Sequence, residues 1–519
     1  MNSPKRIIVN TVASYGQSVI SIALTLFSVR WILQALGETD FGLFSVVGSL
    51  TLLITFLSGG LSVGVSRFYA YSIGETSKDK EGVPEDDLKR WFNTAFSLHI
   101  IVPFLLIGIG WPIGDYAIQN WLTIPVDRIE ICLWVFRFSL VSTFFGVLAV
   151  PFVSMYQAHQ HIFELAAFSV LRVSATFVLS WSLLHVSADR LMIYAGGIMV
   201  IGVVIQLLQM ARACVKFEAC RLQVSYFYDQ TYMKKLFGFV GWKMIGMSGI
   251  GFRRQGAPVL INLLYGPLVN AAFSIADRLS IQATTLSSAM TQAFLPALVS
   301  AEGSGDRDKV ISMSIQVSKL GALLILIFAV PLVLEMQFVL DLWLGEPPDY
   351  TAQICQILVS MLVIDRMTSG AMLAVYAYGG IALYEVTQGL LLFSTLPLIW
   401  LLHAAGFGPI SVGYALITSM LACGVGRLIF AKRLLGCLVA HWARKVLLPV
   451  FLLVVASTFS GLFVMKVLES SFIRLILTTS ATLLVTLPIA WFKLLNAEEK
   501  CYILNILIRK FPQLKKPHL

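Results

Sequence analysis

The sequence predicts an all-α, multi-pass membrane protein with about fourteen transmembrane helices. Three observations lead to this class: composition, recurring hydrophobic runs and the placement of charge. The chain of 519 residues is 57% hydrophobic and only 13% charged, and its mean hydropathy is +0.82. A chain of this composition is too apolar for a soluble globular protein.

Hydrophobic runs of about 20 residues or more, the length that a helix needs to cross a bilayer, follow one another along the chain. The first run comes after Lys5 and Arg6 and lacks a short apolar region with a small-residue cleavage site. We therefore expect it to stay as the first span and not to be removed as a signal peptide. The expected spans cover residues 8–36, 41–73, 91–116, 131–156, 163–184, 191–211, 237–264, 269–299, 310–340, 350–377, 381–403, 410–430, 446–465 and 472–492.

Charge placement sets the expected orientation. The net charge is +10, and of the 38 Lys and Arg residues about 23 lie near alternate span ends, about 4 near the opposite ends and about 11 inside spans. This is the positive-inside pattern of a membrane protein and not a nucleic-acid patch, so we expect no nucleic-acid partner. It places both termini in the cytoplasm, with a basic amphipathic tail on the inner surface.

The chain also predicts two related halves. The turn at residues 36–42 resembles Leu264-Tyr265-Gly266-Pro267, which lies roughly 230 residues later. Similar segments at such a long interval are typical of internal repeats. The expected parts are an N-terminal lobe of six spans (residues 1–215), a cytoplasmic linker (216–236), a second lobe of six spans (237–434), two further spans (435–495) and the basic tail (496–519).

Signatures of catalysis are missing. The sequence has no G-x-x-x-x-G-K-[ST] motif, which would cradle the phosphates of a nucleotide. The seven cysteines show no C-x-x-C pair, and His159-Gln160-His161 has no acidic or cysteine neighbour to complete a metal site. We expect no metal, no cofactor and no enzymatic activity.

Cations inside the spans are the strongest functional signal. A charge at the bilayer centre costs at least about 2.5 kcal/mol, so such residues face water or a partner. Guanidinium groups bind phosphate bidentately and stay charged when desolvated, which favours an anion-binding lumen. Arg67 and Arg427 lie nearer the inner ends of their spans; Arg67 either lines the lumen or extends to the surface, and Arg427 is expected to extend. The predicted substrate-binding residues are Arg30, Arg67, Arg253, Arg254 and Arg278.

Acidic residues inside the spans leave two interpretations open. Asp277 and Asp365 each precede an arginine, Arg278 and Arg366, and neighbours on a helix do not face each other. Pairing between helices or a role in ion coupling would each explain Asp277, Asp365 and Arg366, and the same choice applies to Glu335 and Glu385.

Several motifs resemble the polysaccharide transporter (O-antigen and exopolysaccharide flippase) branch of the multidrug/oligosaccharidyl-lipid/polysaccharide (MOP) superfamily. The likeness covers about residues 5–433, and the order and spacing of the motifs carry it. The motifs are LGETDFG at residues 36–42, VVG at 46–48, Arg67-Phe68, IGE at 73–75, Gly241-Trp242, Gln255-Gly256, Asn262 and YGPLVNAA at 265–272.

The resemblance implies two pseudo-symmetric six-helix lobes in a V, here with two extra C-terminal helices, and a cavity that opens alternately to each side. It implies transport of undecaprenyl-pyrophosphate-linked glycan across the bacterial inner membrane, with membrane lipids and the polysaccharide polymerase and chain-length machinery as partners. Members of the family are similar in carrying lumen cations on spans one, two, seven and eight, and the spans that hold such cations here carry Arg30, Arg67, Arg253, Arg254 and Arg278. A peptidoglycan-precursor flippase or a cation-coupled multidrug exporter of the same superfamily is the near alternative, and a membrane glycosyltransferase or polymerase is a more distant one.

Overall fold

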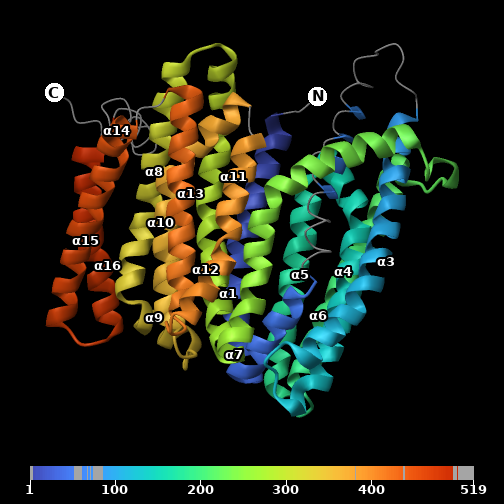
Figure 1. Cartoon of the computed structure of the whole chain (residues 1–519), viewed down its shortest axis with the longest axis horizontal. Helices are drawn as coiled ribbons and strands as arrows, with labels where there is room; N and C mark the ends of the chain where they lie inside the picture. The colour runs from blue at the N-terminus through green and yellow to red at the C-terminus, as the bar shows by residue number, and fades with distance from the viewer. Residues whose placement is uncertain are drawn as a thin grey trace. The chain divides into compact units, whose positions relative to one another are not determined.

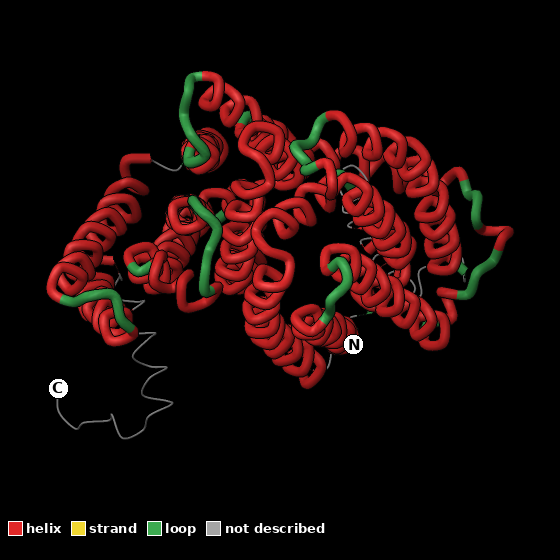
Figure 2. The backbone as a smooth tube through the Cα atoms, turned by 90° about the horizontal axis from the view of Figure 1, so that it is seen from below, coloured by secondary structure: helices red, strands yellow, loops and turns green. Residues whose placement is uncertain are grey.

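The computed structural model describes residues 4–51, 61–62, 64–66, 68–69, 72–73, 86–159, 161–379, 382–436, 439–494 and 500. Side chains are described throughout these ranges except at residues 4–15, 237–248, 250, 285–293, 295–297 and 300. The described residues form helices joined by short loops, with no strand among them (Figure 2). The tail at residues 501–519 and most of the second expected span lie outside the described residues.

Twelve helices in the described part of the chain are long and apolar enough to cross a membrane. This confirms the all-α, multi-pass class. The difference from about fourteen has two sources. Most of the second expected span lies outside the described residues, and α7 runs on from the seventh expected span into the eighth, so that this pair counts as one helix. The long helices, labelled in Figure 1, are α1 (Pro4–Ser49), α3 (Asp87–Asn120), α4 (Ile129–Ala158), α5 (Ile162–Ser182), α6 (Arg190–Lys216), α7 (Gln230–Gly303), α8 (Arg307–Leu334), α10 (Thr351–Tyr378), α13 (Ser411–Leu435), α15 (Leu448–Val467) and α16 (Phe472–Ile489).

Shorter elements connect these helices or continue them. Helices α11 (Ala382–Phe393) and α12 (Thr395–Ala404) together form one span. The π-helical turn η5 (Ala443–Leu447) leads from α14 into α15, and a second one, η6 (Ala490–Leu494), follows α16. The remaining short elements are η1 (Val126–Arg128), η2 (Leu183–His185), η3 (Glu218–Cys220), η4 (Val224–Tyr226), α9 (Met336–Leu344) and α14 (Val439–Trp442).

Helices α1 and α7 break at corresponding glycines. Gly37 has φ 74° and ψ 174°, and Gly266 has φ 80° and ψ −179°. Only glycine adopts such left-handed conformations without strain, so each glycine fixes the point at which one helical leg ends and the next begins. The two turns therefore share a backbone conformation as well as a sequence pattern.

The chain divides into two compact units. Unit 1 comprises Met1–Arg278, Trp343–Ile354 and Glu385–Ala415, and unit 2 comprises Leu279–Leu342, Cys355–Tyr384 and Leu416–Leu519. In unit 1, α4 packs on α3 and α6, and α1 packs on α5. In unit 2, α15 packs on α16 and α8.

The segment after α6, expected to be a linker, is docked on the start of α3. The side-chain amide of buried Asn93 donates to the backbone carbonyl of Arg221, and its carbonyl oxygen accepts from the backbone of Gln223 at 2.7 Å. Thr94 and Ser97 donate to the backbone carbonyls of the following residues Tyr226 and Phe227. These bonds satisfy loop backbone groups that no helix could satisfy.

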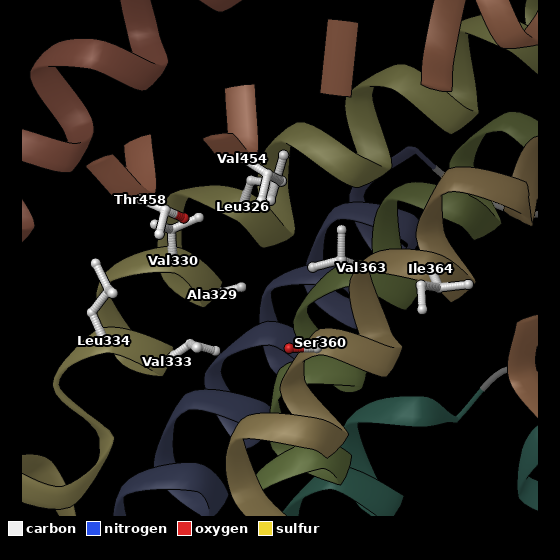
Figure 3. Close-up of a pocket in the computed structure, with 10 residues that line it drawn as sticks. All are labelled: Leu326, Ala329, Val330, Val333, Leu334, Ser360, Val363, Ile364, Val454 and Thr458. Atoms are coloured by element: carbon white, nitrogen blue, oxygen red, sulfur yellow. The ribbon is translucent and has the colours of Figure 1, made fainter. Parts of the chain in front are cut away.

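Unit 2 contains an apolar cavity of about 270 Å³ between α8, α10 and α15 (Figure 3). Hydrocarbon side chains from these helices line it, with Ser360 and Thr458 as the polar exceptions. Beside it, the fully buried carboxylate of Glu335 accepts three hydrogen bonds from Arg474 and one from Thr478. Glu335 therefore has a structural role, because this ion pair fastens α16 to the end of α8.

Candidate functional site

The two legs of α7 carry four of the predicted site residues at one level. Arg254 lies about twelve residues before Gly266, and Arg278 lies about twelve residues after it. At 1.5 Å per residue, each is about 18 Å from the turn along its own leg. That depth is close to the middle of a hydrocarbon core about 30 Å thick. The carboxylate of Asp277 interacts electrostatically with Arg254, Arg253 and Arg278. The structure thus brings together three cations and one anion.

These side chains are accessible to different degrees. Arg254 is exposed, whereas Arg253, Asp277 and Arg278 are half-buried. With one carboxylate among three guanidinium groups, the cluster carries a net positive charge. We call Arg253, Arg254, Asp277 and Arg278 the α7 charge cluster. Its arrangement can bind an anion while Asp277 offsets part of the repulsion between the arginines.

Aromatic side chains hold Arg278 in place. Its guanidinium carbon lies 5.2 Å from the centroid of the Phe41 ring, a cation–π distance. The guanidinium also interacts with the hydroxyl of buried Tyr194 in α6. Phe41 follows the Gly37 turn, so Arg278 is positioned by two other helices of unit 1. No sequence pattern pointed to Tyr194, because tyrosines are common in membrane spans.

The first-span cation lies at another depth. Arg30 is half-buried on α1, about seven residues before Gly37, or about 10 Å from that turn. Arg67 lies outside the described residues. Arg137 pairs with Asp115 at 3.5 Å and its guanidinium lies over the rings of Trp111 and Trp134, so its charge is already balanced.

Asp365 belongs to a closed ion network in unit 2. Its carboxylate accepts from Arg427 at 2.9 Å and from Arg366, whose long side chain folds back on the neighbouring residue. Arg427 also donates to the hydroxyl of Thr368 at 3.0 Å. The expectation that Arg427 extends to the membrane surface is therefore wrong: it is 9% exposed and points into the bundle, where a carboxylate from α10 attracts it.

The last predicted acid, Glu385, is half-buried near the start of α11, and no ion pair to it is described. Among the described residues there is no group of three or more His, Cys, Asp or Glu side chains placed to hold a metal ion. His161 instead contacts the Glu164 carboxylate at 3.3 Å and the Lys216 ammonium at 2.9 Å.

Several solved structures share this fold, and three of them are compared with this chain. The lipid II flippase MurJ in an inward closed conformation matches with a TM-score of 0.70 and 12% identity, over 97% of this chain and 100% of that one. An inward-facing MATE-family multidrug resistance transporter of the MOP superfamily matches with a TM-score of 0.66 and 14% identity, over 81% of this chain and 98% of that one. A MOP superfamily transporter from Pyrococcus furiosus matches with a TM-score of 0.60 and 16% identity, over 83% of this chain and 95% of that one.

No family model matches the sequence, and no curated protein is detectably similar to it. The chain therefore has the fold of MOP superfamily transporters at low sequence identity. The predicted superfamily fold is confirmed, whereas the O-antigen branch stays a prediction.

Proposed function

We propose that the protein is a flippase for undecaprenyl-pyrophosphate-linked oligosaccharides, such as an O-antigen, capsule or exopolysaccharide repeat unit, in the bacterial inner membrane. The α7 charge cluster is the observation that carries this proposal. Its three arginines offer bidentate donors at membrane mid-depth, where a diphosphate would otherwise pay a large desolvation cost. Arg253, Arg254 and Arg278 bind the phosphates, and Arg30 and Arg67 extend the cationic path.

The driving force needs no nucleotide. A membrane potential that is negative inside drives an anion outward. This contributes about 2.3 kcal/mol per charge per 100 mV. Alternating access between a lobe of residues 1–215 and a lobe of residues 237–434 carries the glycan across. The apolar cavity at Val330, Val363 and Val454 accepts part of the polyprenyl chain, whose carbon atoms need no polar partner.

A peptidoglycan-precursor flippase is the second candidate, because the chain shares its fold over 97% of its length with a structure described as a lipid II flippase. A peptidoglycan precursor also carries a lipid diphosphate, so the α7 charge cluster suits both substrates. A multidrug exporter for cationic compounds is less compatible with this cluster, because its net charge would repel them.

The test separates transport from synthesis and the two glycans from each other. If the protein is a flippase, deletion of its gene in the host should cause complete lipid-linked repeat units to accumulate on the inner leaflet. Truncated units would instead identify a transferase. In proteoliposomes, purified protein should translocate the host's lipid-linked repeat unit; preference for the peptidoglycan precursor would select the second candidate.

Matched variants connect transport to the site. Arg278→Ala and Arg30→Ala should each reduce translocation at least about tenfold without lowering membrane abundance, because a charge-assisted contact is lost. Lys466→Gln, which removes an exposed cation at the far end of α15, is the control and should leave transport unchanged. Unchanged transport in both arginine variants would remove these residues from the site.

A further inference from the structure

The entry to α15 carries a groove that the transport proposal does not use. The groove measures about 380 Å³ and is lined by Ala443, Arg444, Leu447, Leu448 and Phe451. Three of its apolar side chains are well exposed: Leu447 at 45%, Leu448 at 54% and Phe451 at 60%. The π-helical turn Ala443–Leu447 forms its upper part, and such turns open a helix surface locally.

The lining residues change from charged to apolar along the helix axis. Arg444 lies at the end of the span, and Phe451 lies about seven residues further on, or about 10 Å deeper at 1.5 Å per residue. A cation at the interface above an apolar groove matches a phospholipid in cross-section, with a phosphate at the membrane surface and an acyl chain below it.

The surrounding charge selects an anionic headgroup. Lys445 and Arg444 are adjacent and exposed, and no described carboxylate pairs with either of them. Trp442, Val446 and Leu494 belong to one core cluster, and η6 packs against α15. Other exposed cations at the ends of α13 and η6 are Lys432, Arg433 and Lys493.

We propose that this groove binds one acyl chain of an anionic diacyl phospholipid, whose phosphate contacts Arg444 and Lys445. The site shares no residue with the α7 charge cluster and does not depend on what the protein transports. It would anchor the C-terminal helix pair in the leaflet that contains the anionic lipid.

A binding measurement on the full-length protein in detergent tests the headgroup. Dioleoyl phosphatidylglycerol and dioleoyl phosphatidylcholine have identical acyl chains, so a difference between them reports the charge alone. We expect the wild type to bind phosphatidylglycerol at least about tenfold more tightly, since each nearby cation contributes. Equal binding of the two lipids would overturn the proposal.

Matched variants locate the site. Arg444→Gln with Lys445→Gln should abolish the preference, whereas Lys234→Gln with Lys235→Gln removes two exposed cations from the start of α7 and should preserve it. An equal loss in both double variants would show diffuse charge attraction and no site. Leu448→Trp fills the groove and should weaken both lipids.

A second measurement needs no loss of charge. With p-benzoylphenylalanine in place of Phe451, illumination should attach phosphatidylglycerol to the protein in preference to phosphatidylcholine. Attachment of neither lipid, or of both equally, would contradict the proposal whatever the charge variants do. Labelling at Phe463, exposed at the far end of the same helix, gives the background for this comparison.

Discussion

The hydroxyl of Ser274 donates a hydrogen bond to the hydroxyl of Ser45 at 2.6 Å, across 229 residues of chain. The same interval separates Gly37 from Gly266, the two glycines that break α1 and α7. Equivalent residues of two related segments touch each other only near a two-fold axis. The contact therefore indicates that a local two-fold axis within unit 1 relates the two turns, in accord with their similar sequences.

This contact should be convertible into a covalent one. With Ser45→Cys and Ser274→Cys in an otherwise cysteine-free chain, we expect rapid disulfide formation on mild oxidation, because the side-chain atoms already meet. The crosslink should arrest transport and a reductant should restore it, if the turns separate during each cycle. Ser49→Cys with Ser274→Cys, displaced by one helical turn, is the control; equally rapid crosslinking of that pair would refute the specific contact.

Gly42 should tolerate no side chain. A Cβ atom there would lie 2.0 Å from the carbonyl oxygen of Pro267, which is backbone and cannot rotate away. Alanine normally stabilises a helix by about 1 kcal/mol relative to glycine, so the sign of the effect is informative. Gly42→Ala should lower the melting temperature in detergent, whereas Gly48→Ala, with nothing within 4 Å of its Cβ, should leave it unchanged or raise it. A more stable Gly42→Ala protein would show that the turns do not pack this way.

The fold could be predicted further than the site. Hydrophobic runs report span positions directly, because each helix must satisfy its backbone inside the membrane. The face of the helix bundle toward which a charged side chain points depends on how the helices pack, and hydropathy does not encode that packing. Arg427 shows the limit: its distance from the span end suggested the surface, yet an acid on another helix, Asp365, determines its position. Phe41 and Tyr194, which hold Arg278, left no trace that distinguishes them from other span aromatics.

Asp277 should weaken substrate binding in the wild type. It is the only described anion of the α7 charge cluster, so Asp277→Asn raises the net charge while keeping the side-chain volume. We expect undecaprenyl pyrophosphate to bind about threefold to tenfold more tightly, and turnover in proteoliposomes to fall because release slows. Asp308→Asn, at an exposed site on α8, should change neither quantity. Weaker binding in Asp277→Asn would place the phosphates elsewhere.

The Asp365 network should serve stability and not transport. Arg427→Gln leaves the Asp365 carboxylate, whose side chain is only 16% exposed, with Arg366 as its remaining cationic partner; loss of one partner of a buried pair costs up to about 3–5 kcal/mol. The melting temperature should fall, and the double change Asp365→Asn with Arg427→Gln should recover part of the loss. Arg433→Gln, exposed on the same helix, is the control. If the folded double variant fails to transport, Asp365 takes part in ion coupling after all.

Two neighbouring cysteines allow the orientation to be tested. Cys214 is exposed at the end of α6, while Cys220 is buried in the following turn; burial raises the pKa of both thiols, and that of Cys220 by more. Because the thiolate is the reactive form, a chain that retains only Cys214 should react with a membrane-impermeant maleimide at least about tenfold faster than one that retains only Cys220. The charge asymmetry of the loops predicts that this end of α6 lies in the cytoplasm, so Cys214 should react in inside-out vesicles and stay protected in intact spheroplasts. Labelling of Cys214 from outside intact spheroplasts would reverse the orientation, and with it the direction in which the membrane potential assists an anion.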